Sequence, residues 1–93
     1  FLILAMNQLV NHLDKLEQMS RGQFKPHVII RTKVGSKRPL DAGPQHTQDH
    51  TAALRQMLKH IEVYKITEPS QIVPWYSEAA AANYSSIFIE ALD

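Results

Sequence analysis

The sequence predicts an α/β fold in which a mostly parallel sheet forms the middle of three layers and helices cover it. Segments with the helical spacing of apolar residues alternate with short segments rich in β-branched residues. This alternation is typical of helices that connect parallel strands. The chain has 93 residues, enough for one small domain, so we interpret residues 1–93 as a single unit.

The first helix is predicted over residues 2–19. Gly22 is predicted to end it, because glycine readily adopts the left-handed conformation that follows many helices. Within the segment, apolar residues recur at intervals of three and four, which places them on one stripe of the helix: Leu2, Met6, Leu9, Leu13 and Leu16.

A buried strand is predicted over residues 27–30, where Pro26 introduces a β-branched run. The polar segment that follows, residues 32–50, carries glycine and proline residues typical of a loop. Loops of this length are uncommon in compact domains and are often functional. Because parallel sheets bind ligands beyond the carboxyl ends of their strands, we expect the functional site here.

The rest of the chain continues the alternation. A helix is predicted over residues 51–60, with Asp49 or Thr51 as its cap, and a strand over residues 62–66. A third helix is predicted to begin at Pro69 and Ser70 and to reach residues 79–82, with Pro74 bending it or marking its first turn. The last strand is predicted over residues 86–89.

Composition excludes several classes of protein. A formal net charge of +1 gives no reason to expect nucleic acid or an anionic membrane as the partner, and the absence of cysteine excludes disulfides and thiolate metal sites. The apolar run at residues 1–6 is too short to span a bilayer and lacks the flanks of a signal peptide. We therefore expect a cytoplasmic or organelle-matrix protein, and a chain that begins inside a larger domain.

Two residues are candidates for chemistry. His46 lies in the middle of the predicted loop, where an imidazole is either a proton-transfer group or a solvated surface side chain. Phe1 is either an exposed chain end or a stacking surface for a planar ring. The residues alone do not decide between these alternatives.

A metal site is not expected. His46 and His50 are four residues apart, with Asp49 between them, and would lie on one face of a helix as metal ligands. Gly43 and Pro44, just upstream, argue against a helix there.

A basic cluster surrounds Gly35 and consists of Lys33, Lys37 and Arg38. Such a cluster suits a phosphate or carboxylate group. No phosphate-binding glycine pattern accompanies it, so solvated loop charges are the favoured interpretation.

Several segments together resemble a known family. In chain order they are similar to a helix, turn, strand and loop of the beta subunits of thiamine diphosphate-dependent 2-oxo acid dehydrogenases, which contain a transketolase-like pyrimidine-binding domain. The resemblance covers the C-terminal half of that domain and rests on these segments: Asn7-Gln8-Leu9-Val10-Asn11, Met19-Ser20-Arg21-Gly22-Gln23-Phe24, Val28-Ile29-Ile30-Arg31-Thr32, Gly43-Pro44-Gln45-His46-Thr47-Gln48 and Ile87-Phe88-Ile89-Glu90.

The resemblance implies a partial thiamine diphosphate-binding fold, with residues 1–93 as one partial pyrimidine-binding domain. It implies that His46 is an active-site histidine that assists proton transfer. It also implies that Phe1, seven positions before Gln8, stacks on the pyrimidine ring of thiamine diphosphate. Both side chains are expected to face the same hollow.

By the same resemblance, the magnesium and diphosphate would be held by a diphosphate-binding domain or an alpha-type subunit, in an oligomer. The chain is then part of an oxidoreductase or of a transketolase-like transferase, and is inactive alone. The alternative function is a non-catalytic assembly module of such a complex.

Overall fold

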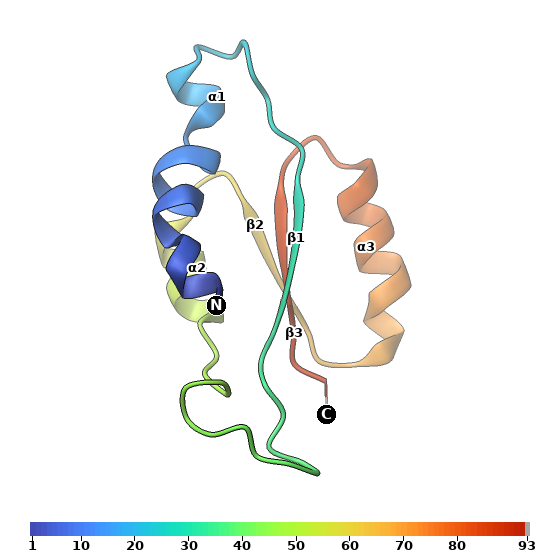
Figure 1. Cartoon of the computed structure of the whole chain (residues 1–93). Coiled ribbons are helices and arrows are strands. Elements are labelled where there is room, and N and C mark those ends of the chain that lie inside the picture. Colours follow the sequence, from blue (N-terminus) through green and yellow to red (C-terminus); the bar gives the residue numbers. More distant parts are fainter. Residues whose placement is uncertain (93) are drawn as a thin grey trace.

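Three parallel strands form the middle layer of the computed structural model, which describes residues 1–92 (Figure 1). They are β1 (Ile29–Lys33), β2 (Glu62–Ile66) and β3 (Ser86–Glu90). The strand order is β1-β3-β2, so the last strand of the chain lies in the middle of the sheet. The prediction of a parallel sheet flanked by helices is confirmed at this level.

Helices cover both faces of this sheet (Figure 1). One face carries a first helical segment, made of η1 (Leu2–Ala5), η2 (Gln8–Leu13) and α1 (Leu16–Met19), together with α2 (Thr51–Met57). The other face carries η3 (Pro69–Gln71) and α3 (Ile72–Ala81). None of the helices within residues 1–92 has the length and apolar character needed to cross a membrane.

Two cores result, because neighbouring residues of a strand point to opposite faces of the sheet. Ile87 and Ile89 of β3 pack with Leu9 and Leu54 beneath the first helical segment and α2. Phe88, which lies between those two isoleucines, packs on the α3 side.

The ring of Phe88 lies between two tyrosine rings on the α3 side. It stacks on Tyr64 with 4.6 Å between the ring centroids and on Tyr76 with 3.9 Å. Trp75 also belongs to this core, so Trp75 and Tyr76 pack α3 against the sheet.

The first helix is less regular than predicted. Most of the apolar stripe packs against the sheet, with Leu9 only 4% exposed, but Leu16 is exposed, contrary to the prediction. The segment contains a 3₁₀ turn and a π-helical turn before the short α1. In the π-helical turn the N–H of Asp14 donates to the carbonyl of Leu9 at 2.9 Å. The widened turn ends at Asp14, whose buried carboxylate binds the chain before β2.

Gly22 ends this segment, as predicted. Arg21 and Gly22 both have positive φ, 56° and 80°, and the N–H of Gly22 donates to the carbonyl of Glu17 at 2.8 Å. This bond satisfies a carbonyl that has no partner within the helix.

Several predicted boundaries are wrong, and the first strand ends at Lys33 rather than at Ile30. The first strand begins at Ile29 rather than at His27, because Nε2 of His27 lies 2.9 Å from the carbonyl oxygen of Ala79 and the N–H of Val28 donates to Ser85 Oγ. The helix predicted to reach residue 60 ends at Met57, because the N–H groups of residues 59–61 bind the carboxylate of Asp14.

The strand predicted over residues 62–66 matches β2, and the last strand continues one residue further, to Glu90. The third helix starts with the 3₁₀ turn η3 and continues as α3. Pro74 is the third residue of α3, in the first turn, where its missing N–H leaves no hydrogen bond unmade.

Candidate functional site

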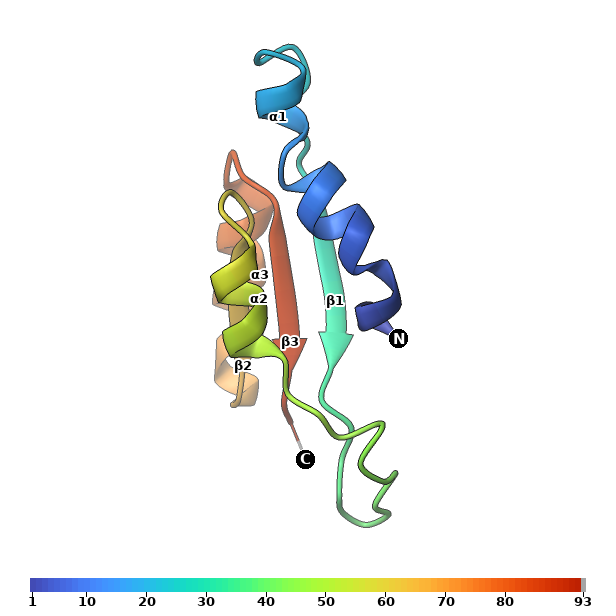
Figure 2. The ribbon, with the colours of Figure 1, turned by 90° about the vertical axis from the view of Figure 1, so that its left-hand side faces the viewer.

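The three strands end at one edge of the sheet, and the loop of residues 34–50 lies beyond that edge (Figures 1 and 2). Val34 follows β1 directly and Ala91 follows β3. This is the edge at which parallel sheets bind ligands. The prediction that the long loop lies at the carboxyl ends of the strands is therefore confirmed.

A close backbone approach ties the two ends of this loop together. A Cβ added to Gly35 would lie 1.9 Å from the carbonyl oxygen of His46, so only glycine fits at this position. Within the loop, the N–H of His46 and the hydroxyl of Thr47 both donate to the carbonyl of Gly43, at 3.1 and 3.0 Å.

The turn before His46 has its own support. Gly43 has a φ of 92°, which favours glycine, and its N–H donates to the Asp41 carboxylate at 2.8 Å. These bonds fix the backbone at His46, whose side chain is exposed. The imidazole is therefore held on an ordered turn and is accessible to a ligand.

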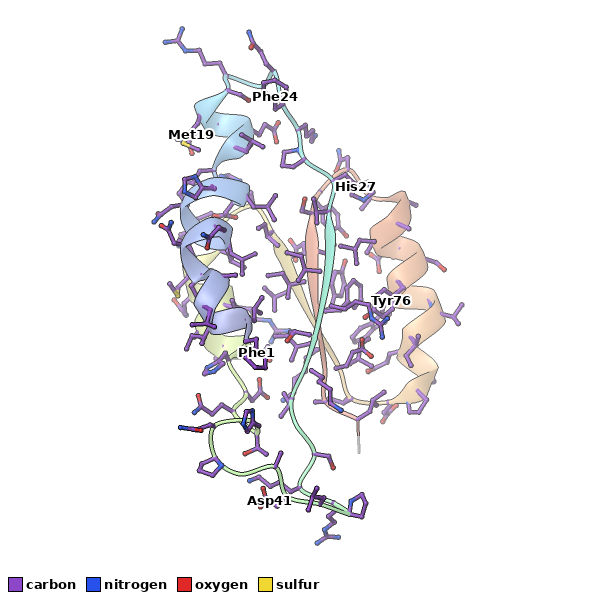
Figure 3. All side chains as sticks on the ribbon, in the orientation of Figure 1. Phe1, Met19, Phe24, His27, Asp41 and Tyr76 are labelled. Carbon is purple, nitrogen blue, oxygen red and sulfur yellow. The ribbon has the colours of Figure 1, made fainter. Side chains whose placement is uncertain are left out.

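Phe1 lies at the same end of the molecule. In Figures 1 and 2 the N-terminus lies beside the carboxyl end of β1, and Figure 3 shows Phe1 nearer to the loop than Met19 or Phe24. Its ring is 99% exposed. The structure thus brings Phe1 and His46 to one end of the sheet.

The single hollow expected between Phe1 and His46 is replaced by two separate hollows, neither of which is lined by Phe1 or His46. The first is apolar, has a volume of about 240 Å³ and lies between the first helical segment and α2. Ile3 and Met6 line one side of it, and His50 and Met57 line the other. One wall of this hollow is therefore the segment next to Phe1, and the other wall includes the end of the loop that carries His46.

The second hollow, which we call the edge cavity, is lined by both charged and apolar side chains and has a volume of about 300 Å³. Residues that follow β1 and β3 line it, together with residues of β2 and of the loop: Val34, Gly35, Lys37, Thr47, Asp49, Lys65 and Ala91. Gly35 and Thr47 connect it to the turn that holds His46.

An ion pair crosses the edge cavity. Nζ of Lys65 lies 2.6 Å from Oδ2 of Asp49, and both side chains are about one-third exposed. Asp49 Oδ1 also accepts hydrogen bonds from the N–H and hydroxyl of Thr51, at 3.0 and 2.5 Å. Hydrogen bonds from Lys65, and then from Thr51, lower the pKa of Asp49 to about 2.

The N-cap of α2 is His50 rather than either predicted residue, although the Asp49 side chain does accept the N–H of Thr51. Because Asp49 also pairs with Lys65, it is not available to join His46 and His50. Among residues 1–92 no three His, Asp or Glu side chains come together in a group that could hold a metal ion.

The basic cluster around Gly35 is divided by the fold. Lys37 lines the edge cavity, whereas Lys33 belongs to β1 and lies near Glu90. Arg38 is exposed and does not line the cavity.

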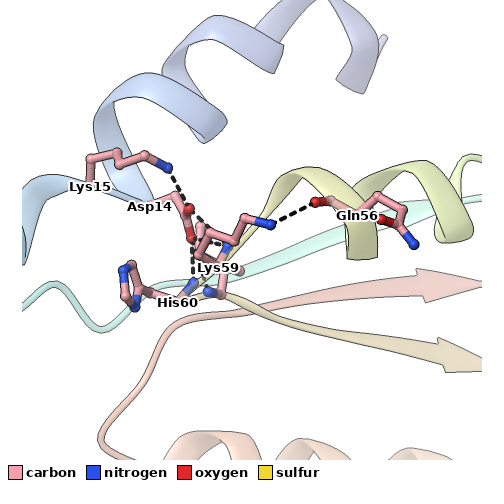
Figure 4. Close-up of polar contacts among 6 residues, drawn as sticks. Asp14, Lys15, Gln56, Lys59 and His60 are labelled. Atoms are coloured by element: carbon pink, nitrogen blue, oxygen red, sulfur yellow. Dashed lines mark hydrogen bonds and ion pairs between the residues drawn. The ribbon is translucent and has the colours of Figure 1, made fainter.

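Asp14, which no sequence pattern singled out, accepts more hydrogen bonds than any other carboxylate in the described part of the chain. Its side chain is fully buried and accepts hydrogen bonds from the N–H groups of Lys59, His60 and Ile61, at 2.9, 2.7 and 3.1 Å (Figure 4). Lys15 Nζ lies 3.1 Å from Oδ2. Burial raises the pKa of Asp14, but the backbone bonds and Lys15 outweigh it, so the pKa lies below its ordinary value.

A second polar group that sequence reasoning missed joins β1, β3 and α3. Arg31 binds Glu90 through two nitrogens, at 2.8 and 3.3 Å, and the hydroxyl of Tyr76 donates to Glu90 at 3.1 Å. The Arg31 guanidinium holds the pKa of Glu90 below its usual range. These residues are 14 or more positions apart, so no local pattern reveals the group.

Comparison with known proteins adds no relative to this picture: no protein-family model, no curated protein and no solved structure matches the chain.

Proposed function

We propose that this chain forms part of the pyrimidine-binding domain of a thiamine diphosphate-dependent enzyme that acts on a 2-oxo acid or transfers a two-carbon unit. The observation that carries the proposal is the position of His46, which lies exposed on an ordered turn beyond the carboxyl edge of a parallel sheet. The resemblance of the segment Gly43-Pro44-Gln45-His46-Thr47-Gln48 to the family's loop supports it.

The exposure of Phe1 fits the first role that the cofactor requires. A ring that is 99% exposed offers its face to a planar ligand, and such aromatic pairs contribute about 0.5–1.5 kcal/mol. That energy is too small to hold a ligand alone. We therefore propose that Phe1 orients the pyrimidine ring, while the diphosphate and magnesium are bound by a diphosphate-binding domain or an alpha-type subunit.

The imidazole of His46 has the second role, to hold and move a proton near the reacting atoms. Bound thiamine diphosphate supplies a carbon nucleophile and an acceptor for the electrons released from the substrate. The hydrogen bonds at Gly43 and the close approach of Gly35 fix the backbone from which His46 projects. A fixed backbone matters because general acid–base catalysis requires the proton donor and acceptor within hydrogen-bond reach.

The test is turnover of the reconstituted complex, formed with the partner subunit, thiamine diphosphate and magnesium. Replacing His46→Ala is expected to lower kcat by about 10²-fold or more, the range of general acid–base catalysis. His12→Ala is the matched control, because His12 is also exposed but lies on the first helical segment. Equal turnover of the two variants would refute the catalytic role.

The second candidate function is a non-catalytic assembly module. Three residues near the start of the first helical segment favour it, because their apolar side chains are largely exposed: Phe1 99%, Ile3 59% and Leu4 79%. Exposed apolar groups of this size are typical of surfaces that bind another protein. A His46→Ala complex with full turnover and unchanged assembly would favour this function.

A further inference from the structure

The edge cavity has the shape and position of a small-ligand site. The ends of β1 and β3 contribute Val34 and Ala91, and β2 contributes Lys65. A water molecule takes up about 30 Å³ in the liquid, so a volume of about 300 Å³ accommodates a small anion with several waters. The loop closes over one side through Gly35 and Thr47.

The charges that line the edge cavity favour an anion. Lys37 and Lys65 contribute two ammonium groups and Asp49 contributes one carboxylate. Asp49 pairs with Lys65 at 2.6 Å, whereas Lys37 makes no ion pair with another residue of the described chain, 1–92. An unpaired ammonium at the wall of a cavity attracts an oxyanion.

We propose that the edge cavity binds a small oxyanion, a carboxylate or phosphate group, through Lys37 and Lys65. The site deepens the proposed function, on which it rests for its biological meaning: it is the place where the acidic group of the substrate lies, next to the turn that carries His46. Lys37 supplies the unpaired charge. The ammonium group of Lys65 either turns from Asp49 toward the anion or donates hydrogen bonds to both Asp49 and the anion.

Asp49 sets the affinity of this site. Its carboxylate repels the anion and competes for Lys65, while its Oδ1 also accepts the N–H of Thr51 at the start of α2. Asp49→Asn keeps an oxygen for that N–H and removes the negative charge. The variant is therefore expected to bind the anion more tightly than the unchanged chain.

The experiment is an NMR titration of the ¹⁵N-labelled chain, at low ionic strength, with inorganic phosphate in one series and pyruvate in another. Both probes are expected to bind weakly, with a Kd on the order of millimolar, and to give saturable shifts at the amides of Gly35, Thr47 and Ala91. The tighter of the two probes identifies the acidic group that the cavity prefers.

Charge variants separate the cavity from the basic loop around it. Lys37→Gln is expected to weaken binding about fivefold or more, and Asp49→Asn to strengthen it by about the same factor, which corresponds to about 1 kcal/mol. Arg38→Gln is the matched control: it removes the same charge one residue away, outside the lining. Its Kd is expected to stay within about twofold of the original, a difference that amounts to about 0.4 kcal/mol.

Shifts that grow linearly without saturation, or equal losses in Lys37→Gln and Arg38→Gln, would overturn the proposal in favour of diffuse attraction to the loop. Circular dichroism shows whether Asp49→Asn remains folded. If that variant unfolds, the comparison of the Kd values of Lys37→Gln and Arg38→Gln tests the proposal without it. The titration contains no thiamine diphosphate. Anion binding together with full turnover of the His46→Ala complex would therefore refute the catalytic proposal and leave the anion site standing.

Discussion

Replacing the buried Asp14→Asn should destabilise the fold more than the loss of any one surface or loop charge discussed above. Asparagine keeps the shape of the side chain, and its oxygen can still accept the N–H groups of His60 and Ile61. The amide NH₂ group that replaces Oδ2 faces two donors, the N–H of Lys59 and the Nζ of Lys15, which lie 2.9 and 3.1 Å from that oxygen. The N–H of Lys59 then keeps only its longer bond to Oδ1, at 3.1 Å. The remaining bonds also lose their charge assistance.

The size of this effect follows from the cost of an unsatisfied buried donor, about 1–3 kcal/mol. We expect Asp14→Asn to lower the free energy of unfolding by about 2 kcal/mol. For a domain of this length each kcal/mol shifts Tm by about 4–8 °C, so Tm should fall by about 10 °C. The loss is a large part of a total that is typically about 5–15 kcal/mol.

Urea denaturation, followed by circular dichroism, measures this loss, and an unchanged m-value shows that the folded and unfolded states are comparable. The matched control is Glu17→Gln, which removes one negative charge three residues later, at an exposed position of the first helical segment. We expect it to change stability by no more than about 0.5 kcal/mol. Equal losses in the two variants would refute the structural role assigned to Asp14.

Two further predictions concern the loop. Because the pKa of Asp49 is depressed to about 2 from 3.8, its stabilising pair with Lys65 is fully present above pH 4. Its contribution, about 1 kcal/mol or less after screening, should be lost as the pH falls toward 2. An acid titration of stability compares Lys65→Met with the unchanged chain, and identical slopes would contradict the pairing. Gly35→Ala should destabilise the chain by about 1–3 kcal/mol, because its Cβ meets the carbonyl of His46; a variant of unchanged Tm would contradict that contact.

The sequence predicted the architecture because its two periodicities are local properties. The β-branched runs near Ile30 and Ile87 and the apolar stripe through Leu9 each bury one face, and a buried face fixes the type of element. The order of helices and strands then required parallel pairing. Gly22 was predictable because glycine adopts a positive φ readily and is common after the last turn of a helix.

The missed features depend on residues distant in sequence. Asp14 binds the backbone of Lys59, 45 positions later, and this contact shortens α2. Lys65 pairs with Asp49 across the end of the sheet. Neither contact leaves a periodic pattern. The expected hollow is divided into an apolar one and one that carries charged side chains. This division was unpredictable for the same reason, because it depends on how the first helical segment meets α2.

The central claim is that Phe1 and His46 bind one ligand at the carboxyl edge of the sheet. NMR spectra of the reconstituted complex, with the phenylalanine rings and histidine imidazoles isotopically labelled, test it most directly during a titration with thiamine diphosphate and magnesium. We expect the Phe1 and His46 resonances to shift together, with one affinity, while those of His12 stay in place. Binding of the cofactor that leaves Phe1 and His46 unchanged would contradict the account.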